Sequence, residues 1–335
     1  MRAIGAKLRR RRLDRKRREG CRRSVAPPFH PRPRHGTFPP MWFDPPRPLA
    51  ASLLSRLPDS LRRPRPSAWA EANRGGAPID SFLEGPCFDA AGNLFCVDIP
   101  HGRVFRVAGT QWEAIADYGG WPNGLAARGH DLVVADYRHG LLALDPRDGA
   151  MAPILETALT ESFRGLNDVV IHPDGSLIFT DQGQTGLQDP TGRVFRLHPD
   201  GRLDRLIANG PSPNGLALNR AATHLMVAMT RSCEVWRFAL RADAMVGKAN
   251  LFFRAPAGTV GPDGLAVDAH DRLFVANPGH GQVWVVDPHG VCTHRVDCTA
   301  FGRMPTNCTL APDGRTLVIS ESESGCLLAA ELPLP

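Results

Sequence analysis

Residues 167–182 read NDVVIHPDGSLIFTDQ, and this stretch contains the unit from which the fold can be predicted. A polar residue opens a short apolar run, Asp174-Gly175 supplies a turn, and a second apolar run follows. Short runs rich in Val, Leu, Ile and Phe that are separated by an Asp-Gly pair are typical of two antiparallel strands joined by a tight turn. The stretch therefore predicts a β-hairpin.

The same pattern occurs six times, at intervals of 39, 44, 47, 49 and 44 residues. The Leu that opens the second run lies 9 to 11 residues after the first residue of each copy. Further strand-like runs follow, such as RVFRV at 103–107 and QVWVVDPHG at 282–290. Four short strands in roughly 40–50 residues make one propeller blade. We therefore predict an all-β fold over residues 81–335, a six-bladed β-propeller with four-stranded antiparallel blades. The copies begin at Glu84, Asn123, Asn167, Asn214, Asp263 and Asn307.

The net charge of +6 comes from the N-terminal end of the chain. Residues 1–40 hold 14 of the 40 Lys and Arg residues and two acidic residues, so the remaining 26 basic and 32 acidic residues give a net charge of −6. We interpret residues 1–40 as a disordered Arg- and Pro-rich tail, or as translation from a start upstream of Met41. The mildly acidic body predicts no nucleic-acid partner. Residues 41–80 form a lead-in segment that could supply the outer strand closing the ring.

The chain shows no sign of export or membrane insertion. The Arg-rich start runs into a polar, Pro-broken segment rather than an apolar one, and no run approaches the ~18 apolar residues of a membrane span. The eight cysteines include no CxxC pair, and most lie within apolar runs. This pattern favours reduced, buried thiols and a cytoplasmic location.

The first residue of each copy is polar. In a propeller the inner strand of every blade lines the central channel, so equivalent positions should surround one axis. Asn and Asp before Gly also suit turns, which would explain Asn123, Asn214 and Asp263 but not Glu84. Two carboxylates and four amides facing one channel favour a binding site instead. Such oxygen donors, without His or Cys, favour Ca²⁺, Mg²⁺ or Mn²⁺ over a structural Zn²⁺ site. We therefore expect one divalent ion, with Ca²⁺ preferred and Mg²⁺, Mn²⁺ or Zn²⁺ as other possibilities.

The chain resembles the SMP-30/gluconolactonase family of metal-dependent lactonases, which are six-bladed propellers. EGP at 84–86, LNDVVIHPDGSLIFTDQG at 166–183, PNGLAL at 213–218 and PDGLAVD at 262–268 carry the resemblance. It implies that Glu84, Asn214 and Asp263 bind the metal, that Asn167 is a further ligand or a substrate contact, and that Asp263 is the general base. The ion would polarise the carbonyl of a small-molecule lactone while Asp263 accepts a proton from the attacking water.

Three further residues are candidates for substrate binding. Asn123 and Asn307 belong to the predicted ring, and Trp121 precedes Pro122-Asn123, so it could pack on a substrate ring; a lone aromatic side chain is more often simple packing. Some sugar-lactone members of the family carry an Arg two residues before the Asn that matches Asn167. Here that position is Gly165, with Arg164 displaced by one, and a slip of one residue in a strand turns a side chain to the other face.

Two other classes of function remain open from the sequence. A propeller can be a non-catalytic binding module, because the fold does not fix the function. A metal-dependent propeller can also act on another ester. No GxSxG, HExxH or P-loop motif occurs, which argues against a serine hydrolase, a zincin and a P-loop nucleotide hydrolase.

Overall fold

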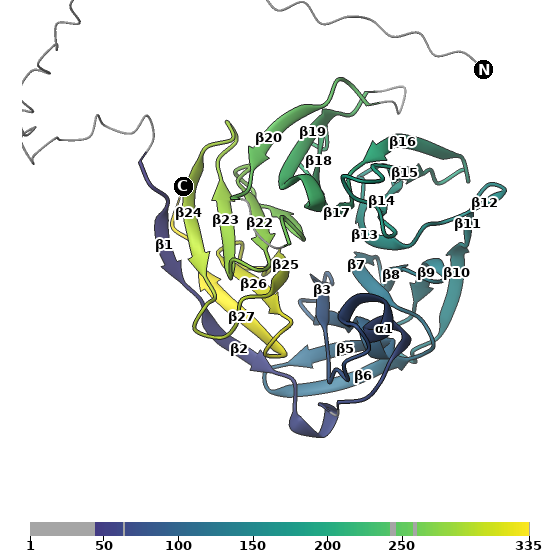
Figure 1. The fold of residues 1–335 in the computed structure, drawn as a ribbon, viewed down its shortest axis with the longest axis vertical. Coiled ribbons are helices and arrows are strands. Elements are labelled where there is room, and N and C mark those ends of the chain that lie inside the picture. The colour runs from purple at the N-terminus through teal and green to yellow at the C-terminus, as the bar shows by residue number, and fades with distance from the viewer. Residues whose placement is uncertain (1–43, 63, 242–245, 257–259, 335) are drawn as a thin grey trace, which may run out of the picture. The chain divides into compact units, whose positions relative to one another are not determined.

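The computed structural model describes residues 44–62, 64–241, 246–256 and 260–334. Six sheets follow one another around a common axis, with the first strand of each sheet innermost (Figure 1). The predicted six-bladed all-β propeller is therefore confirmed. The tail predicted at 1–40 lies outside the described residues.

Blades 1 to 3 are antiparallel four-stranded sheets in the order of the sequence. Blade 1 consists of β3 (Leu83–Phe88), β4 (Leu94–Asp98), β5 (Arg103–Ala108) and β6 (Gln111–Asp117). Blade 2 consists of β7 (Pro122–Arg128), β8 (Asp131–Asp136), β9 (Gly140–Leu144) and β10 (Met151–Leu155). Blade 3 consists of β13 (Leu166–Ile171), β14 (Leu177–Asp181), β15 (Gly192–Leu197) and β16 (Leu203–Gly210), and it is preceded by a small hairpin of β11 (Thr157–Ala158) and β12 (Glu161–Ser162).

Blades 4 to 6 repeat this arrangement. Blade 4 consists of β17 (Pro213–Leu218), β18 (His224–Met229), β19 (Glu234–Ala239) and β20 (Asn250–Arg254). Blade 5 contains β21 (Leu265–Val267), β22 (Leu273–Asn277), β23 (Gln282–Val286) and β24 (Cys292–Asp297). Blade 6 contains β25 (Pro305–Leu310), β26 (Thr316–Glu321) and β27 (Cys326–Glu331).

The lead-in segment joins the ends of the ring. β2 (Ser52–Arg56) pairs antiparallel with β27 and is the outer strand of blade 6. The strand before it, β1 (Arg47–Ala50), pairs in parallel with β24, so blade 5 has five strands rather than the predicted four. The N-terminal strands thus bridge two blades, which covers sheet edges that would otherwise be open to other chains.

Apolar side chains fill the spaces between neighbouring blades. One cluster takes Phe95 and Val97 from blade 1 and Leu132 and Val134 from blade 2, and all four are almost completely buried. Their alternation along the strands sends one set of side chains to each neighbouring blade. Burying each such side chain contributes about 1.5–3 kcal/mol, so packing between blades holds the inner strands in place.

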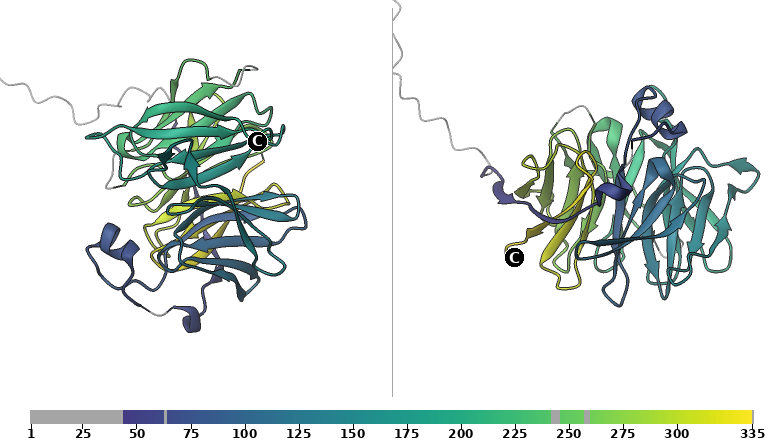
Figure 2. Two further views of the ribbon diagram at one scale, coloured as in Figure 1. Left: turned by 90° about the vertical axis from the view of Figure 1, so that its right-hand side faces the viewer. Right: turned by 90° about the horizontal axis from the view of Figure 1, so that it is seen from below.

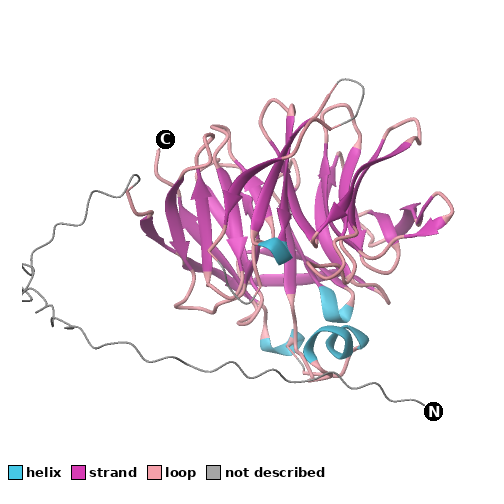
Figure 3. Ribbon diagram, turned by 45° about the horizontal axis from the view of Figure 1, so that its top comes forward, coloured by secondary structure: helices cyan, strands magenta, loops and turns pink. Residues whose placement is uncertain are grey.

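One α-helix lies against blade 1. α1 (Ala68–Arg74) is capped by Ser67, whose hydroxyl accepts a hydrogen bond from the N–H of Ala70. The helix buries Trp69 against Phe82, with ring centroids 4.8 Å apart. Figures 2 and 3 show α1 projecting beyond one end of the strands. Three short 3₁₀ helices occur at Asp59–Leu61, Ile99–His101 and Thr230–Ser232. Across the described ranges, no helix has the length and apolar character that crossing a membrane requires.

Candidate functional site

In five of the six blades, all except blade 5, the inner strand begins with an irregularity that sets the direction of its first side chains. In β13, Leu166 pairs with Asp181 and Val169 pairs with Phe179, so two residues of β13 stand opposite the single residue Thr180. This is a β-bulge, which bends a strand and re-aims its side chains. The residue after the first pair occupies the same place in blades 1 to 4, and in blade 5 the residue two positions before the Leu265–Val275 pair takes this place, as Asn167 lies two positions before the Val169–Phe179 pair; we call these five residues the first ring. They are Glu84, Asn123, Asn167, Asn214 and Asp263.

Blade 6 departs from the register expected from the sequence. Pro305 pairs with Glu321 and Cys308 with Ile319, as Leu166 and Val169 pair in blade 3. Thr306 therefore takes the first-ring place, and Asn307 lies one residue further along its strand. The Thr306 hydroxyl turns away and donates a hydrogen bond of 2.9 Å to the Leu83 carbonyl oxygen.

Asn307 belongs to a second ring, directly after the first. Four of its members are Gly85, Gly124, Gly215 and Gly264, because neighbouring inner strands approach closely here; a methyl group at position 124 would come within 2.5 Å of Asp168 Oδ1. Asp168 and Asn307 are the two members with side chains. They come from blades 3 and 6, on opposite sides of the ring (Figure 1).

The side chain of Asn307 fixes Glu84. Glu84 Oε2 accepts hydrogen bonds from the amide of Asn307 at 2.9 Å and from the N–H of Gly85 at 2.7 Å. Asn307 Oδ1 in turn accepts a bond from the N–H of Cys308 at 2.7 Å. Within the described part of the chain these bonds to Glu84 end on one oxygen, so they orient the carboxylate while Oε1 can face a ligand.

Asp168 occupies the equivalent place in blade 3 with the opposite chemistry. Its Oδ2 accepts a bond from the N–H of Leu216 in the next blade, at 3.3 Å, and its Oδ1 accepts one from Val169 at 2.8 Å. The residue of blade 1 that corresponds to Leu216 is Pro86, which has no N–H to offer. An acidic side chain at position 307 would therefore lack the backbone N–H that Asp168 has. The amide of Asn307 can instead donate its hydrogen bond to Glu84.

The other first-ring residues have defined partners. The Asn167 amide donates to Gln182 Oε1 at 3.0 Å, and a side-chain hydrogen bond joins Asn214 to Asp263. The Asn123 amide donates to the carbonyl oxygen of Trp121, at the start of its own blade, at 3.0 Å. The structure thus links Glu84 to Asn307 and Asp263 to Asn214, while Asn123 bonds back to its own strand.

The site holds three buried carboxyl groups. Burial raises the pKa of Glu84 well above its usual range, the nearby Asp263 raises it further, and the bonds from Gly85 and Asn307 lower it in part. Burial also raises the pKa of Asp263 to about 8 and that of Asp168 to about 7. The exposed Arg231 partly offsets the charge near Asp263. Buried acidic groups this close together favour either protonation or a bound cation.

The donor set fits a hard divalent cation. The carboxyl groups of Glu84 and Asp263 are buried and near enough for the charge of Asp263 to raise the pKa of Glu84, and carboxylate and side-chain amide oxygens are the ligands preferred by Ca²⁺ and Mg²⁺. Over the described ranges, no three His, Cys, Asp or Glu side chains form a metal-binding group by themselves. A cation at this position would therefore depend on the amide oxygens of Asn167 and Asn214 as well.

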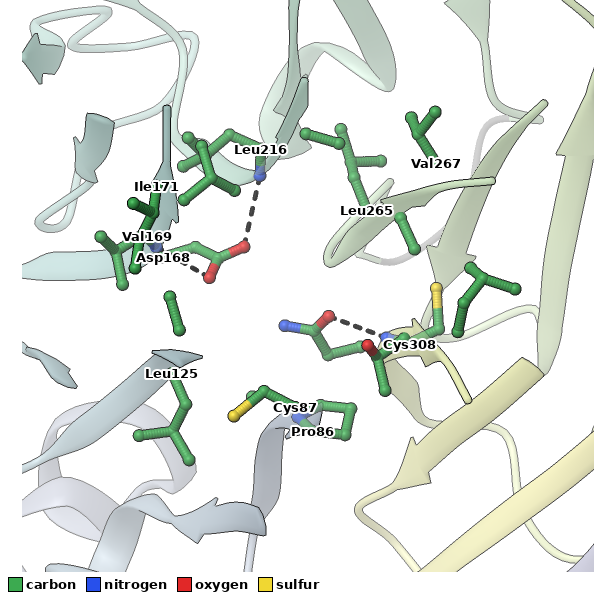
Figure 4. A pocket seen from close by; sticks show the side chains of 18 of the residues that line it. Pro86, Cys87, Leu125, Asp168, Val169, Ile171, Leu216, Leu265, Val267 and Cys308 are labelled. Atoms are coloured by element: carbon green, nitrogen blue, oxygen red, sulfur yellow. Dashed lines mark hydrogen bonds between the residues drawn. The ribbon is translucent and has the colours of Figure 1, made fainter. Parts of the chain in front are cut away.

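Asp168 was missed by the sequence reasoning. The signal was present, since a lone carboxylate interrupts the apolar run of NDVVI at the place where four other blades have Gly. It faces a cavity of about 440 Å³ below the two rings, lined mainly by apolar side chains such as Leu125, Val169 and Leu265 (Figure 4).

Several known proteins are similar to this chain in sequence or in fold. A family model described as SMP-30/Gluconolactonase/LRE-like region matches residues 82–323. A gluconolactonase from Zymomonas mobilis is 30% identical over 200 residues, which are 55% of this chain and 55% of that protein. The diisopropyl-fluorophosphatase of Loligo vulgaris is 26% identical over 73% of this chain and 87% of its own length. A solved gluconolactonase from Xanthomonas campestris superposes with a TM-score of 0.67 at 25% identity, covering 84% of this chain and 98% of that one.

Proposed function

The chain belongs to the SMP-30/gluconolactonase/LRE-like family, and from this premise we propose that it is a divalent-metal-dependent hydrolase that opens lactones. The match to the Zymomonas gluconolactonase spans about half of that protein, 55%, so the activity is inferred from the site as well as from the likeness. The observation that carries the proposal is the pair of buried carboxylates, Glu84 and Asp263, among amide donors at one end of the channel.

We assign the cation to Glu84, Asn167, Asn214 and Asp263. Ca²⁺ is favoured over Zn²⁺ because the side chains supply oxygen donors and no His or Cys. When bound, the ion would supply Lewis-acid polarisation of the ester carbonyl. The two carboxylates would neutralise the charge of the ion, and the ion would in turn stabilise their ionised forms in this buried position.

Asp263 is the proposed proton acceptor. Its carboxylate takes the proton of the attacking water, and the hydrogen bond to Asn214 holds it in orientation. Asn167, held by Gln182, orients the substrate or completes the ligand set. Asn307 was predicted to contact substrate, but its amide is bonded to Glu84, so we assign it the role of positioning that carboxylate.

Two alternatives are separable by experiment. The first alternative is a hydrolase that uses the same residues on another ester, and the likeness to the Loligo diisopropyl-fluorophosphatase supports it. A non-catalytic binding module would lack turnover altogether. A cytoplasmic location remains a prediction, which the seven described cysteines suit because all are free thiols.

The test combines metal binding with turnover. The full chain, stripped with chelator, is titrated by calorimetry with Ca²⁺, Mn²⁺ and Zn²⁺, and hydrolysis of δ-lactones is followed by proton release with and without each ion. We expect one ion bound per chain and hydrolysis that chelator abolishes and the ion restores. Ion binding without hydrolysis of any lactone would refute the lactonase assignment, and full activity after chelation would refute the metal.

A further inference from the structure

The rim of the site is built from two residues in each blade. The first lies two positions before the first-ring residue, and the second follows the last residue of the second strand. In every blade except blade 5, where the second residue is Pro278, the N–H of the second residue donates a hydrogen bond to the carbonyl oxygen of the first, for example Tyr137 to Trp121 at 2.9 Å, Gln182 to Gly165 at 2.9 Å and Thr230 to Ser212 at 3.0 Å. The Asn123 amide bonds to the Trp121 carbonyl oxygen, and the Tyr137 ring lies where a Cβ of Gly165 would be, two residues before Asn167, so this part of the rim lies beside the first ring.

The rim over blades 1 and 2 is aromatic. The Trp121 and Tyr137 rings have centroids 5.3 Å apart, and the guanidinium of Arg138 lies 4.3 Å from the Trp121 ring centroid. Phe82, the rim residue of blade 1, packs on Trp69 of α1. All three rim aromatics are only partly buried, so each keeps some surface exposed.

Tyr137 also fills the place of a side chain at position 165. A Cβ on Gly165 would overlap the Tyr137 ring, whose hydroxyl oxygen accepts a hydrogen bond from the Gln184 amide at 3.3 Å. Gly165 has φ = 140°, a backbone conformation that L residues rarely adopt. Residue 165 therefore cannot carry a long polar side chain that reaches over Asn167. The aromatic ring of Tyr137 occupies the space that such a side chain would need.

The rim over blades 3 and 4 is small and polar. The Gln182 amide donates to the Ser212 hydroxyl at 3.0 Å while its oxygen accepts from Asn167. The Thr230 hydroxyl donates to the Pro262 carbonyl oxygen at 2.8 Å. Each of these polar groups already has a hydrogen-bond partner within the protein, which makes it less available to substrate hydroxyls.

We propose that the site selects lactones that carry an aromatic or branched apolar substituent and discriminates against polyhydroxylated sugar lactones. The substituent packs on Trp121, Tyr137 and Phe82, and the ester lies over the first ring. Burying the hydroxyls of a sugar lactone against aromatic faces leaves them without hydrogen-bond partners, which costs binding energy. The proposal rests on the lactonase function above and names its substrate class.

The test uses three lactones with the same six-membered ring: δ-valerolactone, its 5-phenyl derivative and D-glucono-δ-lactone. With Ca²⁺ present, we expect kcat/KM for the phenyl lactone to exceed that of the parent about ten-fold or more, with the glucono-lactone lowest. Trp121→Leu and Tyr137→Leu should each lower the ratio of the phenyl to the parent lactone several-fold. The control is Trp236→Leu, because Trp236 is a similarly half-buried indole on β19, bonded to Glu234; this variant should keep the ratio.

The outcomes separate the two proposals. Turnover of the glucono-lactone above that of the phenyl lactone would overturn the selectivity while leaving the lactonase function standing. A Trp121→Leu variant that lowers kcat/KM for the phenyl and parent lactones by the same factor would also overturn the selectivity proposal. A purely structural role of Trp121 would change the two kcat/KM values equally. Absence of hydrolysis of all three would overturn the lactonase function and this inference together.

Discussion

The two ends of the channel are lined by the same six inner strands, yet their side chains differ in character. At the end where the strands begin, carboxylates and amides form the first ring. Below the second ring the strands line a cavity of about 440 Å³ whose side chains are mostly apolar. The bulge and the close approach at the Gly positions lie between the two ends. The comparison teaches that a local irregularity, repeated in five of the six blades, separates a polar site from a mostly apolar cavity along one strand.

The largest effect should come from Asp263→Asn in the first ring. The change keeps the shape but removes the proton acceptor and one negative ligand, so kcat should fall roughly 10²- to 10⁴-fold and divalent-ion binding should weaken. Steady-state kinetics and calorimetry measure both effects. Because burial raises the pKa of Asp263 and so disfavours its ionised form, replacing it with a neutral amide should leave stability without metal unchanged or raise it. Near-normal turnover would show that the first ring is not the catalytic end.

The next largest effect should be the increase in stability of the folded chain when the ion binds. Ion binding should stabilise the folded chain, because the ion compensates the negative charge of the buried carboxylates in the first ring. At a free concentration of 100 Kd, linkage gives about 2.7 kcal/mol, visible as a rise in Tm. In Glu84→Gln the rise should shrink or vanish. An equal rise in wild type and Glu84→Gln would place the ion elsewhere.

A third test sharpens the boundary between the two rings. Asn307→Leu removes the donor that orients Glu84, and metal affinity should fall about 10- to 100-fold, as is typical for partners of metal ligands. The matched control is its neighbour: Thr306→Val removes a hydroxyl bonded to the Leu83 carbonyl oxygen and should affect stability rather than metal affinity. The reverse order of effects would support the register read from the sequence.

The smallest effect is expected at the lower end. Val267 lines the cavity and packs beside the cluster between blades 4 and 5. Val267→Ala should lower the free energy of unfolding by about 1 kcal/mol through lost packing and change kcat/KM less than two-fold. Denaturant titration and kinetics check this. A large loss of activity at normal stability would mean that the lower cavity takes part in function.

Much of the fold could be read from the sequence because its signals are local and repeated. The hairpin at 167–182 and its five copies predict strand, turn and strand in each blade. The polar first residues could be picked out in five blades, because Glu84, Asn123, Asn167, Asn214 and Asp263 do take equivalent places. The prediction for blade 6 was wrong, because Asn307 fits the sequence pattern whereas the strand pairing places Thr306 in the first-ring position.

The sequence by itself determined the number of blades, the spacing of the strands and the oxygen-rich character of the inner strand starts, since these follow from periodicity and residue type. Only the tertiary structure decided which residues meet. The Asn307–Glu84 bond and the Tyr137 ring over Gly165 join different blades, and the β1–β24 pair joins the lead-in segment to blade 5. Such contacts depend on how blades pack and on where each bulge shifts the register, and a shift of one residue moves a side chain between rings without changing the pattern along the chain.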